Sequence, residues 1–314
     1  MTYKTKLSNS QGQAVLLVVL TLAVVLTLVL SIVARTITDV QTTSVEEDSL
    51  RAFSAAEAGI ERHLNSSTYT FTDFAVNNVE VTGSITPKYN GDAQINYPEK
   101  LKEGEVATVW FVEHDSSGNL VCDGSPVCYD AANANSATLR LCWGETGGPD
   151  AAAEISIYYD PDYDFDFSDV QVARFAVDPV DLRADTNNFK DDQSGITGCT
   201  AVGDEAVSYI RRMTINLDDT GSLKFDIPDA VLTNEKGLLF ARVRFYYNGS
   251  GSVPFGMTLP GGGGNSVFAS QARVIESSGR FGDAERSVEV TALYPDLPPI
   301  FDYSLFSLGG SLSQ

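Results

Sequence analysis

The stretch that decides the fold runs from Gln13 to Ala34 and reads QAVLLVVLTLAVVLTLVLSIVA. Its 22 residues include no charged residue, no proline and no glycine. A helix rises about 1.5 Å per residue, so this length matches the roughly 30 Å of hydrocarbon in a bilayer. A helix also satisfies every backbone polar group within the segment, as a single span requires. We therefore predict a transmembrane helix over residues 13–34.

The residues on either side of this span predict its orientation. Lys4 and Lys6 precede it, and Arg35 alone follows before the acidic residues begin. The positive-inside rule therefore places the amino terminus in the cytoplasm and the rest outside a single-pass cytoplasmic (inner) membrane protein. A cleaved secretory signal is the alternative, but its apolar core is usually about 7 to 15 residues long. A cut after Ala34 would also put bulky Ile32 where a small residue is needed.

Residues 35–64 predict an amphipathic continuation of the same helix. The segment has no proline, and its second half is rich in good helix formers. Large apolar residues recur there at helical spacings, as in one stripe of an amphipathic helix. The residues of this stripe are Leu50, Phe53, Ile60 and Leu64. We expect the stripe to carry an outer domain.

Glu57 lies on the same stripe, between Phe53 and Ile60. One interpretation is a carboxylate at the edge of the stripe that reaches water. The other is a partly buried carboxylate that meets a base or backbone amides of the outer domain and fixes how the helix docks. The second follows because a buried carboxylate without a partner is costly.

Charge and composition restrict the function. The 314 residues include 21 Lys and Arg against 42 Asp and Glu, for a net charge of −21. Such a surface repels polyanions, so we predict no nucleic-acid binding. His63 and His114 are the only histidines, and the glycine run 261–264 lacks the Lys and Ser/Thr of a phosphate-binding loop. We predict no enzymatic activity and no cofactor.

Four cysteines follow the predicted span, an even number that suits an oxidising compartment. We expect Cys122 to pair with Cys128 and Cys142 with Cys199, although four cysteines allow three connectivities. Zinc binding is the alternative. It is disfavoured because the chain has no Cys-x2-Cys pair and only two histidines.

Two stretches resemble a known family. The segments SQGQAVLL (10–17) and RAFSAAEAGIE (51–61) are similar to the amino-terminal region of PilX-type minor pilins of type IV pili. K-type pseudopilins are similar in outline. The resemblance implies that a prepilin peptidase cuts between Gly12 and Gln13, removes residues 1–12 and methylates Gln13. It also implies that the helix lies in membrane lipid first and later packs against other pilins or pseudopilins.

Leu17 departs from the usual pilin pattern. Most pilins carry a glutamate five residues after the cut glycine, whereas PilX-type and K-type proteins tend to lack it. An uncharged side chain offers no carboxylate to the amino terminus of a neighbouring subunit. The resemblance therefore implies a minor subunit that contributes to filament assembly or initiation.

The carboxyl end carries a fainter resemblance to PilX-like proteins, in residues 271–291 and in the Phe-Asp-Tyr segment of residues 298–306. Two other functions stay open. One is a membrane-anchored surface adhesin or binding module, and the other is a K-type pseudopilin of a type II secretion system.

Residues 65–314 predict an acidic, β-rich external domain or two subdomains, so the fold class is α+β. Short alternating runs separated by turn residues indicate an antiparallel sheet or sandwich. The expected strands are 79–86, 106–113, 137–143, 155–159, 170–177, 207–217, 238–247, 267–276 and 286–294.

The acidic run DPDYDFDFSD (160–169) is a weak candidate for calcium. Asp160, Asp162 and Asp164 fit the start of a calcium loop, in which oxygen ligands surround the ion. Phe165 and Gln171 stand where the turn glycine and the bidentate glutamate belong. We favour a solvated strand edge, with Asp on one face and aromatic residues on the other.

Overall fold

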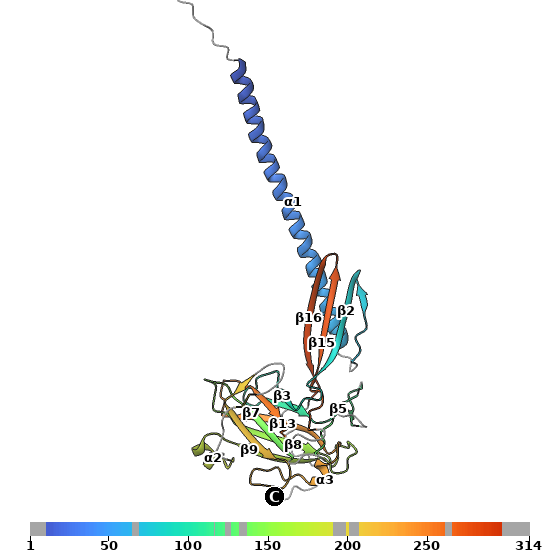
Figure 1. Ribbon diagram of the computed structural model, residues 1–314, viewed down its shortest axis with the longest axis vertical. Helices are drawn as coiled ribbons and strands as arrows, with labels where there is room; N and C mark the ends of the chain where they lie inside the picture. Colours follow the sequence, from blue (N-terminus) through green and yellow to red (C-terminus); the bar gives the residue numbers. More distant parts are fainter. Residues whose placement is uncertain are drawn as a thin grey trace, which may run out of the picture. The chain divides into compact units, whose positions relative to one another are not determined.

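The computed structural model describes residues 11–64, 69–115, 117–122, 127–131, 137–190, 199–200, 207–260 and 266–296 (Figure 1). Residues 1–10 of the predicted leader and the 298–306 segment lie outside these residues. The chain divides into two compact units. Among the described residues, those of 11–61, 72–83 and 277–288 form the first unit, and the others form the second unit.

The long helix α1 (Gln11–Leu64) has 54 residues and no interruption, and it ends where the sequence predicts. It is long and apolar enough to cross a membrane. The hydroxyls of Thr21 and Thr27 donate hydrogen bonds to the carbonyls of Val18 and Val24, at 2.9 Å and 2.8 Å. These bonds satisfy both threonine hydroxyls of the apolar segment within the helix.

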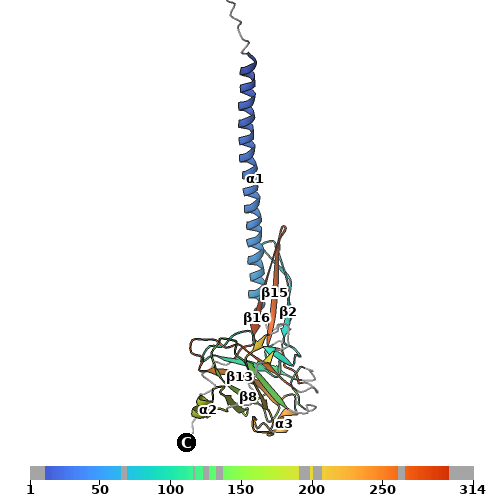
Figure 2. The ribbon, with the colours of Figure 1, turned by 60° about the vertical axis from the view of Figure 1, so that its left-hand side comes forward.

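A four-stranded sheet accompanies α1 in the first unit. Its order is β1 (Phe74–Val76), β2 (Val79–Lys88), β15 (Ala272–Phe281) and β16 (Ala284–Leu293), and the last three strands extend into the second unit. Figures 1 and 2 show β2 and β15 beside the carboxyl-terminal part of α1. Asn77 and Asn78 form the two-residue turn between β1 and β2, and both have positive φ. This conformation matches the right-handed twist of the two paired strands.

Small residues bring α1 and β15 into close contact in the first unit. A Cβ atom added to Gly279 would lie 2.1 Å from the carbonyl oxygen of Ala52, and one added to Gly59 would lie 2.0 Å from Ser277 Oγ. Ala52 and Ala56 are fully buried. The helix therefore packs through its Ala and Gly face, because only small side chains allow so short a backbone distance.

The predicted apolar stripe is wrong as the packing face. Leu50 and Phe53 are 63% and 42% exposed, and only Ile60 of the stripe is buried within the first unit. Leu64, in the second unit, is exposed as well. The large side chains of the stripe would hold the sheet away from α1, whereas Ala52, Ala56 and Gly59 leave room for the backbone of β15.

The second unit contains two four-stranded antiparallel sheets that share one core. The first has the order β12 (Arg211–Asn216), β7 (Thr138–Trp143), β14 (Phe255–Thr258) and β3 (Gln94–Asn96). The second has the order β4 (Val106–Trp110), β13 (Leu238–Tyr246), β8 (Ala152–Tyr159) and β9 (Gln171–Val177). Alternate residues of both sheets enter the core, as in a β-sandwich: Leu139, Leu141 and Trp143 from β7, and Ala241, Val243 and Phe245 from β13.

Short elements complete the second unit. They are β5 (Glu113–His114), β6 (Leu120–Val121), β10 (Cys199–Thr200), β11 (Ser208–Tyr209), α2 (Asp181–Asn187) and α3 (Asp229–Leu232). Most predicted strands are confirmed, but three ranges need correction. The 106–113 range stops at Trp110 and resumes as β5, and the 207–217 range is broken at Ile210. The 267–276 strand begins only at Ala272 and continues to Phe281.

Candidate functional site

The apolar part of α1 presents its side chains outward. Leu17 is 63% exposed, and large aliphatic residues stay exposed along the segment as far as Val33. Gly12 and Gln13 lie in the first turn of the helix backbone. The cleavage and methylation of this turn stay predictions. Chemically, the segment is a continuous apolar surface that lipid or other apolar helices can cover.

Glu57 does not dock the helix. Its side chain is exposed, whereas its neighbour Ala56 is fully buried. The buried face of α1 is centred on Ala52, Ala56 and Gly59, which places Glu57 on the outer side of the helix. The interpretation of a carboxylate in water fits this position, and the docking interpretation was wrong.

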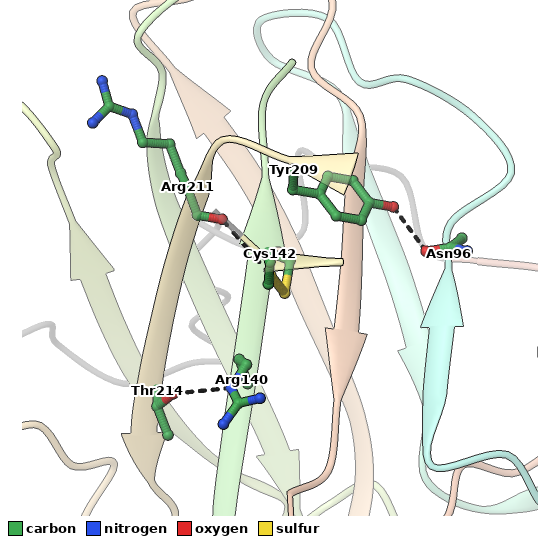
Figure 3. The surroundings of a disulfide bond; sticks show 7 residues. Asn96, Arg140, Cys142, Tyr209, Arg211 and Thr214 are labelled. Carbon is green, nitrogen blue, oxygen red and sulfur yellow. Dashed lines mark hydrogen bonds between the residues drawn. A yellow bond between two sulfur atoms is a disulfide. The ribbon is translucent and has the colours of Figure 1, made fainter. Parts of the chain in front are cut away.

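Both expected disulfides are present, and both lie in the second unit. Cys122 pairs with Cys128, and Cys142 of β7 pairs with Cys199 of β10. Figure 3 shows that the second bond lies beside Tyr209, whose hydroxyl donates to Asn96 Oδ1 at 3.0 Å. Burial raises the pKa of Tyr209. The disulfide thus joins β7 to a segment that also contacts β3.

The acidic run is a loop, so the predicted strand edge is wrong. Strand β8 ends at Tyr159, and Tyr163 and Phe165 both have positive φ. The cause is Asp160, which is fully buried. Its two carboxylate oxygens accept hydrogen bonds from four successive backbone N–H groups, those of residues 162–165, at 2.7–3.0 Å.

Three carboxylates lie close together in this loop, and they are not the same three that were predicted as calcium ligands. Oxygens of Asp160, Asp164 and Asp169 lie within 4.8 Å of one another, and Asp162 is not in the set. Burial and a hydrogen bond with Asp162 raise the pKa of Asp169. Because the backbone already satisfies Asp160, the loop conformation has an explanation that needs no cation.

A cleft of about 670 Å³ opens in the second unit, and we call it the aromatic cleft. One wall is the β5–β6 hairpin. The Asp115 carboxylate closes its turn by accepting the backbone N–H groups of Ser117 and Asn119, at 2.7 Å and 2.9 Å. The residues that line the cleft are Leu64, Trp110, His114, Asp115, Ser117, Gly118, Asn119, Leu120, Asp164, Phe165, Phe167, Arg273, Tyr294 and Pro295.

Packed rings fix the floor of the aromatic cleft. The His114 ring lies edge-on to Trp110, with centroids 4.4 Å apart, and stacks on Tyr294 at 4.1 Å. The Tyr294 hydroxyl donates to Ser270 Oγ at 3.3 Å. At the rim, Phe167 is 59% exposed. The cleft therefore combines fixed rings with one exposed ring.

Polar groups of both signs stand among these rings. Asp164 is exposed, and Arg273 is buried with its Nη2 donating to the Leu64 carbonyl at 3.4 Å. The hydrogen bond from the Asn119 side chain, followed by those from backbone amides, lowers the pKa of Asp115. The Asp115 carboxylate is thus engaged within the hairpin.

His114 is neutral at physiological pH. Burial lowers its pKa to about 4, although nearby Asp115 acts in the opposite direction. Its Nδ1 is buried and has no hydrogen-bond partner in the part of the chain that the structure describes. Protonation would therefore add charge to a site without an acceptor for it.

Sequence reasoning assigned no role to the aromatic cleft. His114 ends the short strand β5, Phe165 and Phe167 lie in the loop after β8, and Arg273 and Tyr294 follow more than a hundred residues later. Only the fold brings them together. The aromatic residues of the DPDYDFDFSD run were the one available signal.

Comparison with known proteins gives no match to a family model, a curated protein or a solved structure.

Proposed function

We propose that the chain is a pilin-like minor subunit of a type IV pilus or a related filament, and that it contributes to filament assembly or initiation. The observation that carries this proposal is that the two halves of α1 have different surfaces. Its amino-terminal half presents an uninterrupted apolar surface, and its carboxyl-terminal half packs against a sheet through small residues. Lipid covers the apolar half before assembly, and the helices of other subunits replace it afterwards.

Leu17 supports a minor rather than a repeating role. Its aliphatic side chain is exposed on the helix five residues after Gly12. In a low-dielectric helical bundle, a carboxylate at this position would attract the amino terminus of a neighbour. Without one, the subunit is suited to start or cap a filament.

Amino-terminal processing tests the proposal. The chain is expressed with and without a prepilin peptidase, and its amino terminus is identified by mass spectrometry. We expect a mature chain that begins with methylated Gln13. Gly12→Val should block cleavage, whereas the matched control Gln11→Ala should not. An intact Met1, in cells where the same peptidase processes another pilin, would contradict the proposal.

A second candidate function is a membrane-anchored binding module, and the aromatic cleft is the observation that favours it. The two candidates differ in what α1 does. For a plain anchor, replacing residues 13–34 with an unrelated apolar helix should leave surface display and ligand binding unchanged. For a filament subunit, the same replacement should abolish assembly with other pilins.

A further inference from the structure

We propose that the aromatic cleft of the second unit binds residues 297–314 of the same chain, which we call the 297–314 segment. This segment lies outside the described residues. The proposal concerns the second unit alone and does not depend on the assembly role of α1. Three observations carry it: the apolar composition of the segment, the exposed apolar side chains of the cleft, and the place where the described chain ends.

The 297–314 segment is apolar although the chain as a whole is strongly charged. It has 18 residues and reads LPPIFDYSLFSLGGSLSQ, with Asp302 as its only charged residue. Moving large apolar side chains from water to an apolar surface is favourable, so the segment favours a surface that covers them. Its eight large apolar residues are Leu297, Ile300, Phe301, Tyr303, Leu305, Phe306, Leu308 and Leu312.

The aromatic cleft offers such a surface. Phe167 is 59% exposed, Leu64 is 47% exposed, and Trp110 is partly exposed. One exposed apolar residue on a surface is ordinary, whereas three that line one cleft indicate a place where another apolar group binds. The volume of about 670 Å³ is also within the usual range of binding clefts.

The described chain leads to this cleft just before the segment begins. Tyr294 and Pro295 both belong to the cleft lining. Asp296, the next residue, accepts a hydrogen bond from Thr108 Oγ1 on β4 at 2.5 Å. Thr108 precedes Trp110 by two residues on the same strand, which is about 7 Å along it. The segment therefore starts from a fixed point close to the exposed ring of Trp110.

This covalent connection selects the segment over a free ligand. An extended chain spans about 3.3 Å per residue, so residues 297–301 alone can cover roughly 16 Å. Pro298 and Pro299 restrict the backbone at its beginning, which reduces the conformational entropy that binding removes. A group tethered so closely has an effective concentration on the order of millimolar. A ligand of the membrane-anchored binding module would have to displace it.

The polar groups of the cleft are compatible with a peptide. Asp115 and Asp164 carry negative charge, and their carboxylates accept hydrogen bonds. The segment supplies backbone N–H groups and serine hydroxyls, which can donate to carboxylates without bringing a charge into the cleft. These groups permit a peptide, and the tether selects this one.

The cleft has its shape before the segment binds. The Cys122–Cys128 disulfide belongs to a buried cluster, and Phe165 and Trp110 pack against this cluster. Stacking fixes the other rings of the floor. Binding therefore orders mainly the segment itself, which limits the entropic cost.

Trp110 reports whether the cleft is covered. The full chain and a variant that lacks residues 297–314 are compared in phospholipid bicelles by acrylamide quenching of tryptophan emission. Trp143 is fully buried, so a difference between the two proteins arises at Trp110. We expect the deletion to increase quenching and to shift the emission to the red. Phe301→Ser/Phe306→Ser should have the same effect, whereas the control Ser311→Ala/Ser313→Ala should have none.

A synthetic peptide of residues 297–308 separates loss of binding from misfolding. Added to the deletion variant, it should reverse the change in emission with a Kd below about 1 mM. Phe167→Ala should weaken this affinity about tenfold or more. Leu182→Ala is the matched control, because Leu182 is an 84% exposed residue of α2 and should leave the affinity unchanged. Thermal unfolding of each variant confirms that it is folded.

Disulfide trapping shows whether the segment binds within its own chain. The four native cysteines are paired, so two introduced cysteines can be read separately. Phe167→Cys is combined in turn with Phe301→Cys and with Phe306→Cys. At low protein concentration we expect a disulfide within one chain in at least one of the two variants. Leu182→Cys combined with the same two substitutions should give none.

Three results would overturn the proposal. The first is that deletion of residues 297–314 leaves the quenching of Trp110 unchanged. The second is that the peptide does not bind to the deletion variant, or binds equally well when Phe167→Ala is present. The third is that the introduced disulfides form only between chains, which would identify a second copy as the partner.

Discussion

His114 illustrates how one partly buried ring couples stability to pH. In the unfolded chain its pKa is near 6.5, and burial lowers it to about 4 in the folded protein. Between these values the unfolded state binds a proton that the folded state excludes. The free energy of unfolding should therefore be highest above pH 6.5 and fall as the pH drops towards 4, by at most roughly 3 kcal/mol.

We expect His114→Gln to flatten this dependence between pH 5 and 6.5, as measured by chemical denaturation at several pH values. Leu120→Ala, in the same hairpin, has no titrating group and should keep the wild-type slope. If His114→Gln also kept the full slope, another group would be responsible.

Arg242 is a second residue whose environment sets its energetic role. It lies on β13, is 3% exposed and pairs with Asp296 at 3.7 Å. The Thr108 hydroxyl also donates to Asp296 at 2.5 Å. Loss of the carboxylate would leave a buried guanidinium short of an acceptor.

We expect Asp296→Ala to lower the free energy of unfolding by about 1–3 kcal/mol, since Asp296 is itself partly exposed. Asp226→Ala is the control, because the Lys224–Asp226 pair is more exposed and should contribute under about 1 kcal/mol. Equal effects of the two substitutions would contradict this account.

At the scale of elements, the contact between α1 and β15 depends on the absence of side chains. A Cβ at Gly279 would meet the carbonyl oxygen of Ala52 at 2.1 Å and the nitrogen of Ala56 at 2.9 Å. Both atoms belong to the helix backbone, which cannot move aside as a flexible side chain can. The two elements would have to separate.

We therefore expect Gly279→Ala to destabilise the first unit by about 2 kcal/mol or more. Hydrogen exchange of the amides in residues 52–60 should become faster. Ser54→Ala, on the exposed side of the same helix, should leave exchange unchanged or slow it slightly. Unchanged exchange in Gly279→Ala would show that the contact is looser than the structure indicates.

At the scale of the whole molecule, the two units differ in what stabilises them. Both disulfides lie in the second unit, and the Cys142–Cys199 bond spans 57 residues. Closing a loop of this length stabilises a fold by about 4 kcal/mol in the chain-entropy account. The first unit depends on the packing of α1 against its sheet.

Reduction should therefore destabilise only the second unit. With a reducing agent, we expect faster hydrogen exchange in β7 and β12 and unchanged exchange in residues 52–60. A Cys142→Ser/Cys199→Ser variant should reproduce the effect of reduction on β7 and β12. Equal acceleration in both units would mean that they unfold as one.

The sequence alone determined the local features of this protein. An uncharged run of 22 residues leaves a helix as the favourable way to satisfy its backbone in an apolar medium, so the amino-terminal half of α1 could be predicted. The helix formers of residues 35–64 predicted its continuation to Leu64. Alternating patterns located most strands, because side chains alternate between core and solvent along a strand. The even number of cysteines predicted two disulfides, and the expected pairing is one of the three connectivities that the sequence allowed.

Only the tertiary structure decided which residues meet over long distances in the chain. The packing face of α1 depends on how closely β15 approaches, so Gly59 and Ala52 matter more there than Leu50 and Phe53. The aromatic cleft joins the β5–β6 hairpin, the loop after β8, and residues of β15 and beyond. No local sequence pattern predicts that these segments lie together. Their contact depends on the pairing of the sheets and on the buried Asp160, whose hydrogen bonds set the conformation of the loop after β8. The long apolar helix is thus a property of the sequence, and the face it packs with and the cleft are properties of the fold.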